Sequence, residues 1–479
     1  MIGTVTNILT SNQELHPVKA GRSLSAVFLS IIILILAVNV LGHQAWKRSR
    51  IIYSDTFSYY AYLPATFIEK DLKLQFLDHD RQSKFNDLWY STSETGVRFT
   101  KMAIGWSVMN MPFFLLAHGS AKMLRYDADG FSLPYQVAIC LATLFYICMA
   151  LVILRKILLN YFSERAVAIT LVLLVFATNL YHYTVFEPGM THPINFFLFS
   201  SFLWLTIRWH KNTTIGNSIL LGLVVGLITV TRASNLLVVL VFPLYGVTGM
   251  RSLVGKVILL FGKARYLFLA AGVAFLVFVP QMLYWNLISG HLIYYSYLDE
   301  HFFFSHPQLL RGLVGFRKGW LVYTPVMILA LAVLFRMKQA KAWSAGIGIF
   351  VVLNIYVILS WWCWWYGGSF GARSFIESYA LLSLPLASFV NQALAKKYVS
   401  IMAVVLLTFF IFLNVFQTIQ YKKGRIHYDS MTRQAYRAVF LKDETPPEWE
   451  SLICHPDYYN AKLGIPERTD CTGHDHNNP

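Results

Sequence analysis

Charge is scarce in this sequence, and the charge that is present leans to one sign. Only 13% of the 479 residues are Asp, Glu, Lys or Arg, and the basic residues outnumber the acidic ones by 40 to 24. A soluble domain carries roughly 25% charged residues. Because 56% of the residues are hydrophobic and the mean hydropathy is +0.51, the composition excludes a water-soluble protein. It indicates a protein that crosses a membrane several times.

Several familiar signals are also missing. No G-x-x-x-x-G-K-[ST] motif occurs, and no G-x-G-x-x-G motif lies between a strand and a helix, which argues against a nucleotide-driven pump. The five cysteines show no C-x-x-C or zinc-finger spacing, although Cys454 and Cys471 could pair in an oxidising compartment. Residues 1–23 are polar and no A-x-A-like site follows, so we expect no cleavable signal peptide.

Long apolar runs recur along the chain and predict an all-α polytopic membrane protein. A run of about 18 or more apolar residues is long enough to cross a bilayer as a helix. We expect eleven spans, at 24–41, 132–154, 165–183, 194–209, 217–231, 236–250, 266–286, 320–336, 343–360, 374–391 and 398–418.

The distribution of Lys and Arg predicts the orientation of these spans. Every second loop is basic, as the positive-inside rule expects of cytoplasmic loops. The N-terminus is then inside and the C-terminus outside, if 102–118 is a juxtamembrane or re-entrant element. Counting 102–118 as a span would move Lys19 and Arg22 to the less basic side. The same loops explain much of the net charge of +16, so no nucleic-acid partner is expected.

Two parts of the chain follow from this topology. Residues 1–418 are expected to form the membrane domain, with a first outer loop at 42–131 that carries juxtamembrane helices. Residues 419–479 are expected to form a small extracytoplasmic tail, which is too short to bury a large core of its own.

The segment 52–64 follows the first span and combines one acid with four tyrosines and several hydroxyl groups. It is too polar to enter lipid and too aromatic for a simple linker. We expect Asp55 to be held at the outer membrane face, in a site built by the rest of the chain, with Tyr59 and Tyr60 beside it. The alternative is an interfacial helix start, with Asp55 as the N-cap and the tyrosines as a belt.

Further polar residues fall at the outer ends of spans. Glu187 and His192 lie in a break that contains two prolines and a glycine, and Arg232 lies in the short link 231–235. A solvated turn would explain Glu187 and His192 equally well. An arginine that extends its head group from a helix end into water would explain Arg232.

The run 361–373 starts with four tryptophans around one cysteine and ends with three glycines in five residues before Arg373. Backbone N–H groups at Gly368 and Ser369 can approach an anion, with Arg373 as its charge partner. The competing interpretation is an i,i+4 ion pair between Arg373 and Glu377.

Together these residues suggest one outward-facing site. It would contain two carboxylates, one imidazole and several cations: Asp55, Glu187, His192, Arg232, Arg373 and Lys101. Such a set beside a lipid face suits the transfer of a sugar from a lipid phosphate to an acceptor hydroxyl. The cations would neutralise the departing phosphate, and a carboxylate would take the hydroxyl proton.

The chain resembles a known family in the segments that carry these residues. The segments read S-D-T-F-S-Y-Y-A-Y-L-P at 54–64, K-M-A-I-G at 101–105, D-G-F-S-L-P-Y at 129–135, F-E-P-G-M-T-H at 186–192 and Y-G-G-S-F-G-A-R at 366–373. They resemble the lipid-phosphate-sugar-dependent glycosyltransferases of the GT-C superfamily, in particular bacterial glycosyltransferase family 39-like or mannosyltransferase-like proteins. Two elements depart from the family pattern, since Lys101-Met102-Ala103 lacks a proline and Arg232 is followed by Ala233-Ser234.

The resemblance implies a GT-C-like helical bundle in a bacterial inner membrane, with a periplasmic site. It implies that Asp55 is the catalytic base or a metal neighbour and that Glu187 is the second acid. The substrate-binding residues would be Lys101, Tyr59, Tyr60, His192, Arg232, Gly368, Ser369 and Arg373. A divalent metal at Asp55, Glu187 and His192 stays open, because the superfamily has metal-dependent and metal-independent members. The partners would be a polyprenyl-phosphate-linked sugar, a glycan, lipid or protein acceptor, and membrane lipid.

A transporter or flippase for a lipid-linked glycan is the main alternative. Ion-coupled transporters usually need ionisable groups deep within their spans. Here the acidic residues are expected at span ends or in loops, which favours a surface site. A non-catalytic scaffold would leave the glycine-rich run before Arg373 unexplained.

Overall fold

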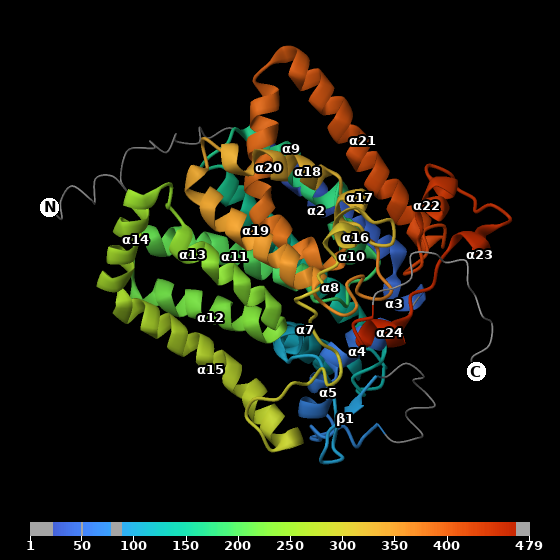
Figure 1. The fold of residues 1–479 in the computed structure, drawn as a ribbon. Helices are drawn as coiled ribbons and strands as arrows, with labels where there is room; N and C mark the ends of the chain where they lie inside the picture. Colours follow the sequence, from blue (N-terminus) through green and yellow to red (C-terminus); the bar gives the residue numbers. More distant parts are fainter. Residues whose placement is uncertain (1–22, 49–50, 78–88, 466–479) are drawn as a thin grey trace.

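The computed structural model describes residues 23–48, 51–77 and 89–465, and helices dominate it (Figure 1). The described residues contain one short sheet, in which β1 (Ser91–Thr92) pairs antiparallel with β2 (Arg98–Phe99). Ser91 lies opposite Phe99 in this pairing. The structure therefore has the helical character of a membrane protein that the sequence predicts.

Five helical segments are long and apolar enough to cross a membrane. They are Leu24–Lys47 (α2, Leu24–His43, with the start of α3, Ala45–Arg48), α8 (Leu133–Leu158), α15 (Ala264–Ser289), Lys341–Leu359 (η3, Lys341–Trp343, with α19, Ser344–Leu359) and α21 (Lys397–Lys422). Shorter apolar helices occur at Ile215–Thr231, Ala233–Leu244 and Val326–Arg336. The predicted count of eleven spans is not confirmed.

Several expected spans are broken into shorter helices. The expected span 165–183 is α9 (Glu164–Phe176) followed by α10 (Leu180–Val185). The break holds Asn179, whose buried side-chain amide donates to the Phe370 carbonyl at 3.2 Å. The expected span 374–391 begins as a 3-10 helix, η4 (Arg373–Ser378), and continues as α20 (Tyr379–Leu394). Both irregular segments carry polar side chains, such as Asn179 and Arg373. Backbone groups that a continuous helix would pair internally need other partners there.

The segment around residue 250 also differs from its expected form. The expected span 236–250 is a 3-10 helix, η1 (Ala233–Leu240), with the single turn α13 (Val241–Leu244). The basic loop that was expected to follow is instead α14 (Met250–Gly262).

The other helices are α4 (Ser54–Tyr60), α5 (Tyr62–Phe67), α7 (Gly105–Ala121), α11 (His192–Lys211), α12 (Ile215–Thr231), α16 (Leu309–Val314), α17 (Trp320–Tyr323), α18 (Val326–Val333), η2 (Leu334–Arg336), α22 (Arg433–Val439), α23 (Trp449–Leu452) and α24 (Tyr458–Lys462).

Small residues let neighbouring helices approach closely, as in other membrane bundles. α12 and α15 lie side by side (Figure 1). A Cβ on Gly222 of α12 would stand 2.2 Å from the Ala270 carbonyl oxygen of α15. A Cβ on Gly226, one turn later, would stand 2.7 Å from the Val277 Cβ. These two glycines form a G-x-x-x-G face, and larger side chains there would push the helices apart.

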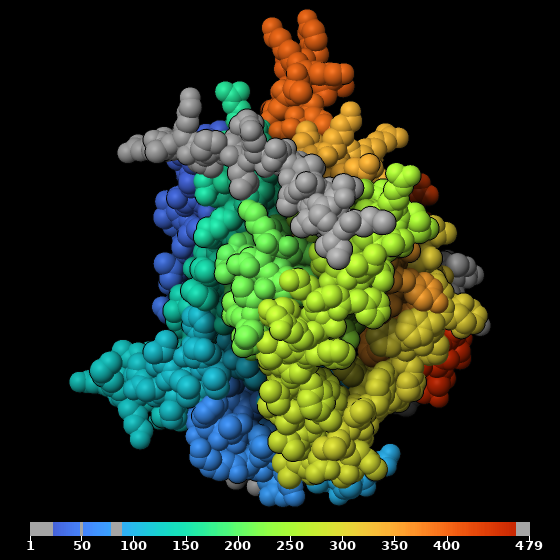
Figure 2. All heavy atoms as spheres, turned by 90° about the vertical axis from the view of Figure 1, so that its left-hand side faces the viewer, coloured from blue at the N-terminus to red at the C-terminus, as the bar shows by residue number. Residues whose placement is uncertain are grey.

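The short elements of the segment 42–131 gather with the C-terminal helix α24 (Tyr458–Lys462) at one end of the molecule. In Figure 1, α3, α4, α5 and α24 lie together at the lower right. Figure 2 shows the chain near the end of α7, coloured teal, projecting sideways from the body. Leu116, Met123 and Leu124 are exposed there. The juxtamembrane position expected for 102–118 stays a prediction.

Candidate functional site

Asp55 and Arg373 form an ion pair between the segment 52–64 and the glycine-rich run. Arg373 Nη2 donates to Asp55 Oδ2 at 2.8 Å, and the side chains are 11% and 18% exposed. Asp55 lies in the first turn of α4, where a negative charge is favourable. It is not the cap of this helix, because the N-cap position is Tyr53. The pair thus brings together two residues that the sequence placed in one site.

The competing interpretation of the sequence paired Glu377 with Arg373. In the structure, the Glu377 carboxylate contacts other residues. Its Oε2 lies 3.0 Å from His192 Nδ1, and its Oε1 lies 3.7 Å from Arg232 Nη1. The Asn235 amide donates to Oε1 at 3.2 Å. Glu377 is only 1% exposed, although it lies at the start of the expected span 374–391, in η4. Its carboxylate is thus positioned to hold His192 and Arg232.

The Arg232 guanidinium is the more accessible member of this second cluster. Its side chain is 21% exposed, against 1% for Glu377. It lies over the ring of Tyr366, 5.1 Å from the centroid, which is a cation–π geometry. Arg232 is therefore held from two sides and keeps an open face, so its simple interpretation as an arginine extending into water is incomplete.

Glu187 faces His182, with 3.1 Å between Glu187 Oε1 and His182 Nε2. Burial acts to raise the pKa of the Glu187 carboxyl, but His182, Arg373 and Lys422 outweigh it and the pKa is lowered. Glu187 is therefore ionised at neutral pH. Its loop lies against α4, because a Cβ on Gly189 would stand 2.4 Å from Thr56 Oγ1.

Tyr59 and Tyr60 have different environments, although they are adjacent in sequence. Burial and then the Asp55 charge raise the pKa of Tyr59 to about 12, while Arg373 and Arg232 act to lower it. The hydroxyl of Tyr59 is therefore protonated and can donate near the ion pair. Tyr60 is 1% exposed, and its hydroxyl donates to the Gly130 carbonyl. The structure thus places Tyr60 in the core, apart from the other expected substrate-binding residues.

The glycine-rich run folds as a tight loop whose amides are largely used within the protein. Ser369 N donates to the Tyr428 carbonyl at 3.2 Å, and Phe370 N donates to the Tyr183 hydroxyl at 3.0 Å. Gly371 has φ +59°, and a Cβ there would stand 3.0 Å from the Tyr323 Cβ. The Ser369 amide is thus not open to an anion as expected. The loop instead positions Arg373.

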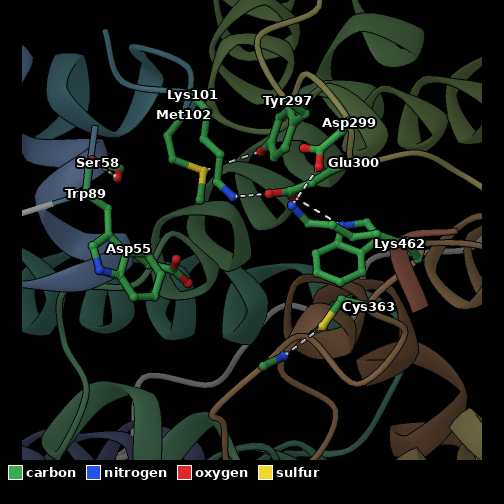
Figure 3. A network of polar contacts seen from close by, with 12 residues as sticks. Asp55, Ser58, Trp89, Lys101, Met102, Tyr297, Asp299, Glu300, Cys363 and Lys462 are labelled. Carbon is green, nitrogen blue, oxygen red and sulfur yellow. Dashed lines mark hydrogen bonds and ion pairs between the residues drawn. The ribbon is translucent and has the colours of Figure 1, made fainter. Parts of the chain in front are cut away.

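Lys101 is part of a separate network, drawn in Figure 3. Its ammonium group forms an ion pair with Glu300, which also accepts from Trp362 Nε1 at 3.2 Å. Tyr297 connects this network with the main site. Burial and then Tyr59, Glu300 and Asp55 raise the pKa of Tyr297, while Arg232 acts to lower it. The phosphate-binding role expected for Lys101 would require it to leave Glu300.

Asn235 belongs to the polar link 231–235 that the sequence singled out. Three other residues around the site were not found from the sequence: Glu300, Lys318 and His182. Lys318 is buried, and its ammonium group donates to the carbonyls of Ser369 and Tyr428. The one sequence signal that could have pointed to Glu300 was the acidic end of the Y-L-D-E stretch at 297–300. No local pattern links it to Lys101, since 199 positions separate them.

Asp55, Glu187 and His192 do not fit a shared metal site as they stand. Asp55 is paired with Arg373, Glu187 with His182, and His192 with Glu377. In the described part of the chain, one group of His, Cys, Asp or Glu side chains is close enough to hold an ion, and it lies in the tail at His427. The pairing of Cys454 with Cys471 stays a prediction, because Cys471 lies outside the described residues.

No family model and no curated protein matches the chain. Solved structures do match it. The apo oligosaccharyltransferase of Archaeoglobus fulgidus has 12% identity and a TM-score of 0.46, over 94% of this chain and 61% of that one. ArnT from Cupriavidus metallidurans in the apo state has 14% identity and a TM-score of 0.43, over 77% and 59%.

A second structure of the Archaeoglobus protein matches as well. AglB in complex with an inhibitory peptide and a dolichol-phosphate has 12% identity and a TM-score of 0.44, over 94% of this chain and 60% of that one. The chain thus spans about three fifths of the length of these proteins.

Proposed function

We propose that this protein transfers a glycosyl group from a polyprenyl-phosphate-linked donor to an acceptor hydroxyl at the outer face of a membrane. The observation that carries the proposal is the ion pair of Asp55 with Arg373. It joins a carboxylate and a guanidinium at 2.8 Å, and both groups keep some exposure. One group can accept a proton and the other can bind a phosphate, which are the two tasks of this transfer.

In the proposed reaction, the donor phosphate binds to Arg373 and draws it away from Asp55. A guanidinium can grip two phosphate oxygens in a planar fork. Asp55 is then free to accept the proton of the acceptor hydroxyl. The bond between the sugar anomeric carbon and the phosphate oxygen breaks, and a bond to the acceptor oxygen forms. The polyprenyl phosphate leaves with the electron pair of the broken bond.

The surrounding residues would assist this step without reacting themselves. The buried Glu377 holds Arg232 and His192, so the open face of Arg232 can add positive charge for the leaving phosphate. The protonated hydroxyl of Tyr59 can donate to an oxygen of the sugar or the phosphate. Glu187 would be a second carboxylate on the acceptor side. A position in a bacterial inner membrane, with this site periplasmic, completes the proposal.

One experiment separates glycosyl transfer from transport. Purified protein in liposomes is given a polyprenyl-phosphate sugar with a label in the sugar, together with a mixture of glycan and lipid acceptors. The proposal predicts that label appears in an acceptor and that an equal amount of polyprenyl phosphate is released. Movement of the intact donor between leaflets, with no release of polyprenyl phosphate, would contradict it.

A flippase for a lipid-linked glycan keeps one specific observation in its favour. Glu377 and His192 form a buried pair of ionisable groups, with Glu377 only 1% exposed. Such buried groups are costly and are typical of proton relays in transporters. However, each oxygen of Glu377 already has a fixed partner, which suits a positioning role. The liposome experiment distinguishes the two functions.

A further inference from the structure

Three side chains of the tail gather outside the site described above. His427 and Asp429 lie between α21 and α22, and His455 lies between α23 and α24. Their candidate ligand atoms all lie within 4.8 Å of one another. Asp429 is buried, His427 is half-buried and His455 is exposed. The group therefore combines a fixed carboxylate with an imidazole that a solvent ion can reach.

The contact between His427 and Asp429 brings two electron-rich atoms together. Ser430 N donates to His427 Nδ1 at 3.1 Å, so this nitrogen carries a lone pair. Asp429 Oδ1 lies only 3.3 Å from the same nitrogen. A proton on Nδ1 would relieve the repulsion, but it would then compete with the Ser430 N–H. A cation bound by both atoms would also relieve the repulsion, and like the proton it would replace the Ser430 N–H on Nδ1.

The hydrogen bonds of Ser430 define the tautomer of His455. The Ser430 hydroxyl donates its one proton to Asp429 Oδ1 at 2.7 Å. His455 Nδ1, at 2.9 Å from the same hydroxyl oxygen, must therefore donate to it. In a neutral imidazole the lone pair then resides on Nε2. Nε2 is thus the nitrogen of His455 that can bind a metal, once the exposed ring turns it toward Asp429.

The carboxylate also has the outer support that metal ligands usually have. Tyr458 donates to Asp429 Oδ2 at 2.9 Å, and hydrogen bonds of this kind orient ligating groups. Zinc lies about 2.0–2.2 Å from nitrogen and oxygen ligands, which places tetrahedral donor atoms roughly 3.4 Å apart. The His427–Asp429 separation of 3.3 Å already has this value.

We propose that His427, Asp429 and His455 bind a divalent transition-metal ion of the zinc type, with water as the remaining ligand. Two imidazoles and one carboxylate are ligands that zinc accepts. The site is independent of the proposed reaction, because it contains none of the residues assigned to phosphate binding or proton transfer.

The bound ion would fix the tail to the loop that carries Arg373. Tyr428 lies between two of the ligands, and its carbonyl accepts from Ser369 N at 3.2 Å. The buried ammonium of Lys318 donates to the carbonyls of both Tyr428 and Ser369. An ion that immobilises His427 and Asp429 therefore also restrains the glycine-rich loop. The metal has a structural role, away from the reacting atoms.

Cobalt is the probe that tests this site, because tetrahedral Co²⁺ has a visible absorption band. Full-length protein in detergent is stripped with a chelator and titrated with Co²⁺, and then with Zn²⁺ to displace it. We expect one equivalent of Co²⁺ and slower hydrogen exchange over residues 366–372 when it is bound. His427→Ala and His455→Ala should each weaken Co²⁺ binding by at least tenfold.

His291→Ala is the matched control, because His291 is also an exposed histidine of an outer loop. It should bind Co²⁺ as the wild type does, and so should Arg373→Ala, which separates this site from the proposed reaction. Since His455 is exposed, its alanine variant tests the proposal even if His427→Ala fails to fold. The absence of Co²⁺ binding in the wild type, or equal binding in the wild type and His455→Ala, would overturn the proposal.

Discussion

Asp55 and Arg373 are 318 positions apart in the sequence, and their side chains meet at 2.8 Å. The pair joins α4 to the 3-10 helix η4, which leads into α20. Both side chains remain partly exposed, at 18% and 11%. A phosphate oxygen can therefore reach the guanidinium and replace the carboxylate on it.

Replacing Arg373 by lysine should weaken donor binding while the protein stays folded. Lysine keeps the charge but cannot grip two oxygens with a planar fork. The loss of one charge-assisted hydrogen bond, worth about 1.5–3 kcal/mol, corresponds to an affinity loss of tenfold or more. Binding of a fluorescent polyprenyl phosphate to purified protein measures this effect. Arg433→Lys, at an exposed position on α22, is the control and should bind normally.

Replacing Gly189 by alanine should disturb the site through α4. The new Cβ would stand 2.4 Å from Thr56 Oγ1 and 2.5 Å from Thr56 Cγ2. Overpacking of this kind costs about 1–3 kcal/mol, and it would displace the helix that carries Asp55. We expect a lower melting temperature and reduced sugar transfer.

A second substitution tests the cause of that defect. Thr56→Ala removes both atoms that the new methyl group would meet most closely, so the double variant should recover stability and transfer. Gly119→Ala on α7 has no atom within 4 Å of the added Cβ and should behave as wild type. A double variant as defective as Gly189→Ala would show that the contact with Thr56 is not the reason.

Replacing Glu377 by glutamine should destabilise the protein and lower transfer together. The change leaves Arg232 and His192 without their buried carboxylate, and breaking a buried pair on one side costs about 3 kcal/mol. Thermal unfolding in detergent measures the first effect. Asp443→Asn breaks an exposed pair with Lys423 and should have no measurable effect. If the Glu377→Gln protein is stable and transfers sugar normally, the cluster of Glu377, His192 and Arg232 is not part of the functional site.

The sequence singled out Asp55 and Arg373, which the structure brings together, whereas the pattern of eleven spans is not confirmed. Asp55 in the segment 52–64 and Arg373 in the run 366–373 can be recognised in the sequence, because charged residues beside apolar runs are rare and costly. Their pairing could not be predicted, since Arg373 had a nearer candidate partner in Glu377. The partner of Lys101 was missed because a contact across 199 positions leaves no local pattern. His182, the partner of Glu187, lies only five positions before it and was also missed.

The span count is not confirmed where the backbone is irregular. Hydropathy does not distinguish a continuous helix from a 3-10 turn, as at η1 (Ala233–Leu240), or from a break at a buried polar residue such as Asn179. The basic residues Arg251 and Lys256 suggested a loop, but they lie on the helix α14. Loops and surface helices at a membrane face have similar compositions.

Labelling with a thiol reagent tests the orientation of the first outer loop. Asp127 is exposed and follows α7. A cysteine in its place should react with an impermeant reagent added outside intact cells, if α7 does not span the membrane. A cysteine in place of Lys338 should react only after lysis, because that loop is expected to be cytoplasmic. The opposite result at Asp127 would contradict the predicted topology.

Sugar transfer by the purified Asp55→Asn protein tests the central claim most directly. Asparagine keeps the shape of the side chain and serves a helix start about as well as aspartate, but it cannot accept the hydroxyl proton. General-base catalysis contributes about 10²–10⁴ in rate. We therefore predict transfer reduced by at least a hundredfold, with the melting temperature and the affinity for polyprenyl phosphate close to wild type. Near-normal transfer from a labelled polyprenyl-phosphate sugar would contradict the assignment of Asp55 as the base.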